Sequence, residues 1–175
     1  MLVGILGTMG LLPSLVDAEG IEQYRPVTNQ RLTQPEPENW LMYRGTYNGW
    51  GYSPLDQITT QNVSTLTPVW TFSSGVTEGH QSPPIVNDGV MFISTPENQV
   101  FALDAKTGDL LWRYRRELPP QGTLTACCGL VNKGFGILGD RLFMVTLDAH
   151  LLALDTRTGA VAWDATMADY TQGYA

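Results

Sequence analysis

The two cysteines of this 175-residue chain, Cys127 and Cys128, are adjacent, in the stretch "TACCGLVNKG". A disulfide between neighbours would close only a small, strained ring, and so short a ring removes almost no entropy from the unfolded chain. If the pair is oxidised, its role is therefore chemical, as a rigid and polarisable pair of sulfur atoms at a functional site. The alternative is two unpaired thiols that pack as small apolar side chains.

An internal repeat predicts the elements that carry this stretch. Residues 89–112 and 140–163 align without a gap, with Asp104 matched to Asp155 at an offset of 155 − 104 = 51 residues, and eight of the 24 positions are identical. Each copy reads as an apolar strand, a second strand ending in "ALD", a "TG" turn and a third strand ending in Trp. Units of this length built from antiparallel strands are typical of β-propeller blades, whereas a β-sandwich would not explain a gapless repeat.

The "TG" turns and the tryptophans give each unit a recognisable end. Gly108 and Gly159 supply the positive φ that a tight reversal needs. The preceding aspartates can accept hydrogen bonds from the turn amides. We expect Trp112 and Trp163 to cover the neighbouring unit, and Trp70 to end an earlier strand in the same way.

Composition narrows the class of protein and of partner. The chain has 18 glycines, 11 prolines and 43% hydrophobic residues, which favours many short strands and turns over an all-helical fold. Ten basic against seventeen acidic residues give a formal net charge of −7, so the surface should repel nucleic acid and anionic lipid.

The first residues predict export. Residues 2–16 are apolar but too few to span a bilayer comfortably, and small and polar residues follow them. We interpret residues 1–19 as a signal peptide, although the usual basic start is missing, and residues 20–175 as the folded domain. The alternatives are a start further upstream, or a buried N-terminal strand or helix. Export would place the cysteines in an oxidising compartment.

Three features together resemble the quinoproteins related to methanol dehydrogenase, the pyrroloquinoline-quinone (PQQ) dependent alcohol dehydrogenases. They are the stretch 39–72, the repeated "ALDxxTGxxxW" and the motif "ACCGLVNKG". The resemblance covers residues 39–175 and implies an all-β fold: the N-terminal blades of an eight-bladed β-propeller, truncated at its C-terminal side in this chain.

The resemblance also implies a set of cofactor-binding residues. Cys127 and Cys128 match the family's vicinal disulfide, which lies against one face of the quinone. Lys133 falls where the family usually has an arginine beside the reactive carbonyl oxygens, and it keeps the charge without the planar fork. Gln81 falls where the family commonly has a glutamate.

The two histidines are not interpreted as site residues. His80 precedes Gln81, and we expect it to be structural. His150 lies in the turn "LDAHL" without a partner evident in the sequence, and we expect it to face solvent.

By resemblance, the whole enzyme would oxidise a small alcohol to an aldehyde or ketone in the periplasm, with PQQ, with calcium or a lanthanide, and with a c-type cytochrome as electron acceptor. The family's metal ligands and catalytic aspartate come later than Ala175, so this chain is expected to hold no catalytic or metal-binding residue and to be inactive alone. The competing interpretations are a non-catalytic propeller scaffold of the outer-membrane assembly type and a relative that has lost its cofactor, which the departures at Gln81 and Lys133 would fit.

Overall fold

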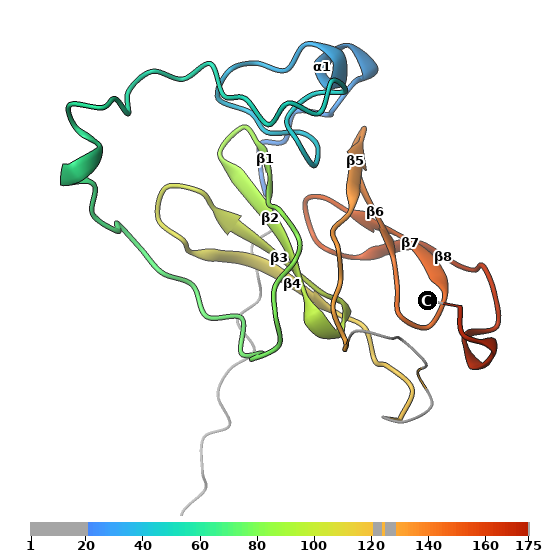
Figure 1. Ribbon diagram of the computed structural model, residues 1–175. Coiled ribbons are helices and arrows are strands. Elements are labelled where there is room, and N and C mark those ends of the chain that lie inside the picture. Colours follow the sequence, from blue (N-terminus) through green and yellow to red (C-terminus); the bar gives the residue numbers. More distant parts are fainter. Residues whose placement is uncertain (1–20, 121–123, 125–128, 175) are drawn as a thin grey trace, which may run out of the picture.

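Two four-stranded antiparallel sheets make up most of the computed structural model, which describes residues 21–120, 124 and 129–174 (Figure 1). The first sheet has the order β1 (Ile85–Asn87), β2 (Val90–Thr95), β3 (Gln99–Asp104), β4 (Leu110–Arg115), and the second β5 (Gly136–Leu138), β6 (Arg141–Val145), β7 (His150–Asp155), β8 (Val161–Thr166). The helices within the described residues are short: α1 (Asn29–Thr33) and the 3₁₀ helices η1 (Val63–Thr65), η2 (Pro96–Asn98) and η3 (Tyr170–Gln172). The predicted all-β fold of propeller blades is confirmed.

The proposed signal peptide, residues 1–19, lies outside the described residues. Within the described part, no helix is long and apolar enough to cross a membrane.

The two sheets repeat one another at the predicted spacing. Strands β1, β3 and β4 begin 136 − 85 = 51, 150 − 99 = 51 and 161 − 110 = 51 residues before β5, β7 and β8. Even the irregularity in the pairing recurs, between Ala102 and Leu103 in one sheet and between Ala153 and Leu154 in the other. Each repeat is thus one sheet.

The strand prediction was wrong in three details. Each unit has four strands where three were predicted. The additional strands, β1 and β5, come before the residues that align between the two units. Trp112 and Trp163 lie in the middle of β4 and β8 and do not end them. Trp70 lies outside any strand of the described structure.

Each tryptophan whose partner turn is described packs on that turn, as predicted. The Trp112 indole is buried, its Nε1 donates to the Thr156 carbonyl at 2.9 Å, and a Cβ built on Gly159 would lie 2.5 Å from its ring. Trp70 does the same one unit earlier, with Nε1 donating to Ala105 at 3.2 Å, and the ring against Gly108. Adjacent units are therefore joined by a tryptophan of one unit that packs on the turn glycine of the next.

The "TG" turns have the predicted chemistry. The Asp104 carboxylate accepts hydrogen bonds from the amides of Lys106 at 2.8 Å and Thr107 at 3.0 Å, and Gly108 follows with a φ of 77°. Those amides, Thr107 first, lower the pKa of Asp104. Asp155 closes the equivalent turn of the second sheet.

One apolar core lies between the sheets, which Figure 1 shows side by side. It is made of alternating inward side chains of both sheets together with residues of the N-terminal segment: Val27, Leu32, Leu41, Ile85, Val90, Phe92, Val100, Ala102, Trp112, Ile137, Leu142, Met144, Leu152 and Leu154. Burial of this shared surface is what holds two sheets together that share no strand pairing.

The N-terminal segment ties the two sheets together at one end. Val27 pairs with Gly139 beside the second sheet, and Trp40 pairs with Val86 in the first. Between these two bridges runs α1, whose Thr28 side chain caps the amide of Arg31.

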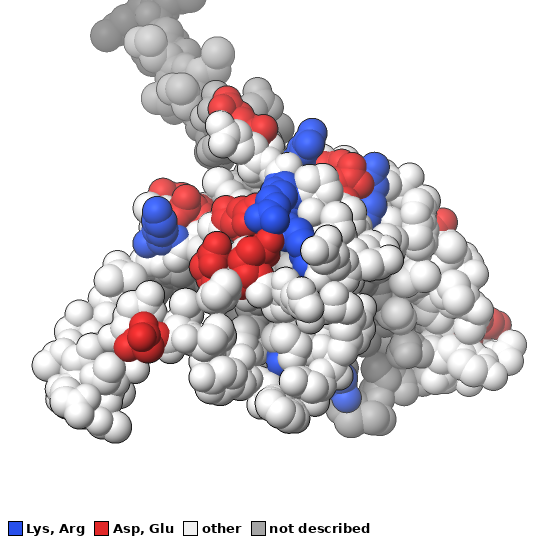
Figure 2. All heavy atoms as spheres, turned by 90° about the horizontal axis from the view of Figure 1, so that it is seen from above, with Lys and Arg blue, Asp and Glu red and all other residues white. Residues whose placement is uncertain are grey.

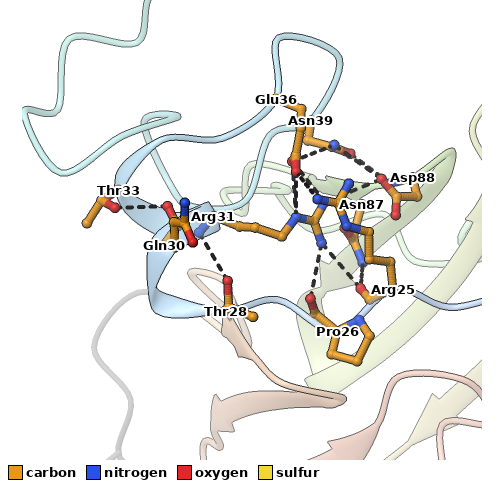
Figure 3. A network of polar contacts seen from close by, with 10 residues as sticks. All are labelled: Arg25, Pro26, Thr28, Gln30, Arg31, Thr33, Glu36, Asn39, Asn87 and Asp88. Carbon is orange, nitrogen blue, oxygen red and sulfur yellow. Dashed lines mark hydrogen bonds and ion pairs between the residues drawn. The ribbon is translucent and has the colours of Figure 1, made fainter.

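A buried arginine fixes the conformation of this segment (Figure 3). Arg31, 5% exposed, donates to the Glu36 carboxylate at 2.9 and 3.1 Å from Nε and at 3.0 Å from Nη2, and to Asp88 at 3.3 Å. Asn39 bridges the same two acids, at 3.1 and 3.2 Å. The Arg31 hydrogen bonds are the main cause that lowers the pKa of Glu36 to about 2.

Seen from the α1 end, acidic and basic side chains gather beside one another near the middle of this face, and most of the remaining surface carries no charge (Figure 2). Neighbouring charges of opposite sign cancel at a distance, so the field of this charged group is weak away from the surface.

Candidate functional site

Two of the four predicted cofactor-binding residues fall in the described structure. Gln81 lies in the irregular segment before β1, and Lys133 in the segment before β5, and both side chains are exposed. Neither makes a hydrogen bond or ion pair with a described residue. Cys127 and Cys128 lie outside the described residues, so their disulfide stays a prediction.

The segments that carry Gln81 and Lys133 adjoin. Gly134 has a φ of 116°, and a Cβ built on it would lie 3.2 Å from the Ser82 hydroxyl and 3.9 Å from Pro83. A side chain at position 134 would thus strain the backbone and crowd residues 82–83. The glycine of "VNKG" lets the two segments approach, which places one uncommitted cation and one uncommitted amide on neighbouring stretches of chain.

Asn132 anchors this arrangement, and the sequence interpretation missed it. The side chain is 5% exposed, and its Oδ1 accepts from the Ser94 hydroxyl and from the Gly134 amide, both at 2.9 Å. Its Nδ2 donates to Asn98 Oδ1 and to the Val145 carbonyl, both at 3.1 Å. These four bonds are all that a carboxamide offers. Lys133 is therefore held between two residues whose positions are fixed.

A signal for Asn132 was present in the repeat. Asn132 and Gln81 occupy equivalent positions, since 132 − 81 = 51. One is buried and fully hydrogen-bonded, and the other is exposed. Equivalent positions with polar residues in both units point to a structural or functional demand.

A charged cluster lies where β4 ends. Arg116 donates to both oxygens of Asp148, at 2.7–2.9 Å, and to Asp164 at 2.8 Å. His150 is hydrogen-bonded through Nδ1 to Asp164, and its Nε2 lies 3.8 Å from Asp148. His150 is partly exposed, but the expectation that it has no partner was wrong, because the carboxylate that binds it lies across the strand pair, on β8. The cluster links the first sheet to the second.

Burial and pairing set the ionisation of this cluster. Burial is the largest single influence and would raise the pKa of Asp148 and of Asp164, but the hydrogen bonds and charge interactions, those with Arg116 foremost, together lower both. Burial would likewise lower the pKa of Arg116, but its hydrogen bonds to Asp148, Asp164 and Tyr114 and the charge of Asp148 together raise it. The charges are committed to one another, so Arg116 is not a free cation for a ligand.

His80 makes only local contacts within the described residues, which fits the structural role expected for it. Its two ring nitrogens are hydrogen-bonded to the Ser74 hydroxyl at 2.9 Å and the Glu78 carbonyl at 3.0 Å, within one turn of chain.

An open cavity of about 680 Å³ lies beside the charged cluster. Its lining mixes apolar and charged side chains from η2, from the end of β4 and from residues 117–120, 124 and 130: Glu97, Arg115, Arg116, Glu117, Leu118, Pro119, Pro120, Leu124 and Leu130. In Figure 1 the chain leaves β4 and returns toward β5 at this end of the sheets, away from α1. The cavity and Lys133 are thus both carried by the connection between the two units.

Comparison with known proteins agrees with this architecture. The family model for the PQQ β-propeller domain of glucose, ethanol and alcohol dehydrogenases matches residues 40–166. The chain belongs to this family. The match includes both sheets, residue Gln81 and the whole "ACCGLVNKG" motif.

The similar proteins are PQQ-family dehydrogenases. The chain is 40% identical over 152 residues to the quinoprotein alcohol dehydrogenase PedH of Pseudomonas putida, covering 85% of this chain and 25% of that protein. It is 36% identical over 172 residues to the lanthanide-dependent methanol dehydrogenase of Methylacidiphilum fumariolicum, covering 97% and 27%. The solved quinohemoprotein alcohol dehydrogenase ADHIIG of Pseudomonas putida HK5 matches with a TM-score of 0.75 and 38% identity, covering 83% and 22%. The chain spans about a quarter of the length of these PQQ-family relatives.

The donors of this PQQ-family chain fit part of a site for the quinone. PQQ carries carbonyl and carboxylate oxygens, which take hydrogen bonds from cations and amides. Lys133 and Gln81 are such donors, exposed and without partners among the described residues. Within that part of the chain, there is no group of three or more His, Cys, Asp or Glu residues that could hold a metal ion.

Proposed function

We propose that this chain is the N-terminal part of an exported, PQQ-dependent alcohol dehydrogenase whose complete propeller has eight blades. The observation that carries the proposal is the family match over residues 40–166, together with two uncommitted donors on adjoining segments. The relatives are alcohol and methanol dehydrogenases, so the substrate class is a small alcohol.

Bound PQQ would take up the two electrons removed when the alcohol becomes an aldehyde or ketone. Lys133 would supply positive charge beside the cofactor's carbonyl oxygens, and Gln81 would hold it by a neutral hydrogen bond. The buried amide of Asn132 and the glycine at 134 fix the backbone that carries this lysine, so that only its side chain needs ordering when the cofactor binds.

The remaining machinery would come from further along the complete protein. We propose that it holds calcium or a lanthanide, as the similarity to a lanthanide-dependent methanol dehydrogenase supports, and the carboxylate that accepts the hydroxyl proton. The periplasm is the proposed location, and a c-type cytochrome the proposed electron acceptor. This chain alone would then be inactive, because it carries one side of the cofactor site.

The test is PQQ binding and dye-coupled alcohol oxidation by the full-length protein with excess metal. Lys133→Ala should reduce turnover by roughly a hundred- to a thousand-fold, the usual effect of removing one preorganised electrostatic contact. Lys133→Arg should retain or improve activity, since it restores the residue usual in the family. Lys106→Ala, which removes an exposed lysine in a "TG" turn, is the matched control and should change nothing. Full-length protein that binds no PQQ would refute the proposal.

A further inference from the structure

The turn η2 between β2 and β3 has an unusual backbone. Glu97 and Asn98 are consecutive non-glycine residues with φ of 64° and 53°. The left-handed region costs most L-residues roughly 1–2 kcal/mol each and is tolerated better by asparagine. Two such residues in a row are held there by the surrounding contacts.

This turn contacts both ends of the connection between the two units. At the start of the connection, the Arg116 amide donates to the Asn98 carbonyl at 3.4 Å. At its end, the Glu97 amide donates to the Leu130 carbonyl at 2.8 Å, and the Asn132 side chain donates to Asn98 Oδ1 at 3.1 Å. Asn98 therefore accepts a hydrogen bond from the start of the connection with its backbone carbonyl, and one from the end of the connection with its side chain.

Comparison with the second unit separates the backbone contact of Asn98 from its side-chain contact. The residue equivalent to Asn98 is Ala149, since 98 + 51 = 149, and it has the same left-handed backbone, with a φ of 58°. Its carbonyl accepts from the Met167 amide at 2.8 Å, and 116 + 51 = 167, so the backbone contact is repeated as well. The left-handed position and its backbone contact thus form with an alanine in the second unit, although Asp148, the equivalent of Glu97, is not left-handed. The asparagine side chain is not needed for that position or that contact.

The asparagine side chain also has a cost. Asn98 is fully buried, and its Nδ2 has no hydrogen-bond partner in the described structure. A buried donor without a partner destabilises the fold. The net gain in stability from this side chain is therefore small, although it supplies one of the four hydrogen bonds of Asn132.

We propose that Asn98 is a positioning residue for Lys133. Through Asn132 it fixes the backbone of residues 132–134 against Ser82, so that the lysine side chain starts from a fixed point beside the cofactor site. The inference rests on the proposed function for the role of Lys133, but the ordering of residues 132–134 does not.

The experiment compares Asn98→Ala with wild type in the full-length protein by three measurements: thermal stability, hydrogen exchange of the Gly134 amide in the absence of PQQ, and PQQ affinity by titration. Alanine is the residue of the equivalent turn, so the melting temperature should stay close to wild type. The Gly134 amide, which donates to Asn132, should exchange faster, and PQQ binding should weaken about ten-fold, the most that one neutral hydrogen bond supports.

Two further variants make the test specific. In Lys133→Ala protein, adding Asn98→Ala should weaken PQQ binding no further, because residues acting through one contact are not additive. Asn39→Ala removes a buried amide at the α1 end, and it should lower stability without changing Gly134 exchange or PQQ affinity.

Unchanged Gly134 exchange in Asn98→Ala would overturn the inference, whatever happens to PQQ. So would faster exchange with unchanged PQQ affinity in a protein where Lys133→Ala does weaken binding. If wild type binds no PQQ at all, the proposed function fails, and hydrogen exchange alone then decides whether Asn98 orders residues 132–134.

Discussion

The Trp112 ring packs directly on Gly159, a residue of the next unit, and the same relationship joins Trp70 to Gly108. In both cases the glycine has a positive φ, 72° and 77°, and the indole Nε1 donates to a carbonyl of the same turn. The glycine therefore serves two purposes at once, a left-handed turn and a flat surface for the ring.

Gly159→Ala should destabilise the full-length protein by about 2–4 kcal/mol, combining left-handed strain with overpacking against Trp112. Gly89→Ala is the matched control: its φ is 81°, but no atom lies within 4 Å of the added Cβ, so only about 1–2 kcal/mol of strain applies. Denaturant unfolding measures both. An equal loss of unfolding free energy in the two variants would mean that the contact between Gly159 and the tryptophan contributes nothing to stability.

Arg116→Leu should cost about 3 kcal/mol, because it leaves the buried carboxylate of Asp148 without its partner. The neighbouring Arg115→Leu should cost about 0.5 kcal/mol or less, since that side chain is 60% exposed and makes one surface ion pair with Glu97. Both are read from unfolding curves at pH 7. A similar loss of unfolding free energy in both variants would contradict the claim that the buried ion pair of Arg116 stabilises the fold more than the exposed one of Arg115.

The Arg116 cluster also predicts a pH dependence. Asp148 and Asp164 have pKa values below their ordinary 3.8, so their stabilising contribution is complete above that pH and is lost as the pH falls through the lowered values. The stability difference between wild type and Arg116→Leu should therefore narrow as the pH drops below about 4. A difference that stays constant down to pH 2 would exclude this linkage.

Glu36→Gln should destabilise the N-terminal segment by about 1–3 kcal/mol, because buried Arg31 loses its charged acceptor. The Glu36 pKa is lowered from 4.5 to about 2, so the contribution is present above pH 4.5 and lost as the pH falls toward 2. Unfolding measured between pH 3 and 6 should show the two proteins converging at the acidic end. Glu38→Gln, an exposed acid two residues away, is the control and should behave as wild type.

Cys127 and Cys128 are expected to form a disulfide in exported protein. Intact mass after alkylation, with and without prior reduction, tests this directly. No alkylation before reduction and two alkyl groups after it are the expected result. Two thiols alkylated in unreduced protein would show that the pair consists of free cysteines.

The sequence by itself determined the repeating unit. The 51-residue offset, the "ALD" strands and the "TG" turns follow from local chemistry, namely side-chain alternation, aspartate acceptors and glycine at positive φ, and they hold in the structure strand by strand. The strands β1 and β5 could not be predicted, because they are three residues long and carry no shared sequence. These residues form strands because they pair with β2 and β6, and that pairing exists only in the folded protein.

Only the tertiary structure decided which polar residues act together. Lys133 and Gln81 could be named from a motif and a resemblance. The repeat could have marked Asn132 as polar in both units, but not its bond to Asn98, because the two asparagines are 34 residues apart in the chain. The same is true of Arg116 and Asp148, 32 residues apart, and of His150 with Asp164 across a strand pair. Sheet pairing and the packing of one unit on the next bring these side chains together, because burial requires each polar group to find a partner and the fold determines which partner is within reach.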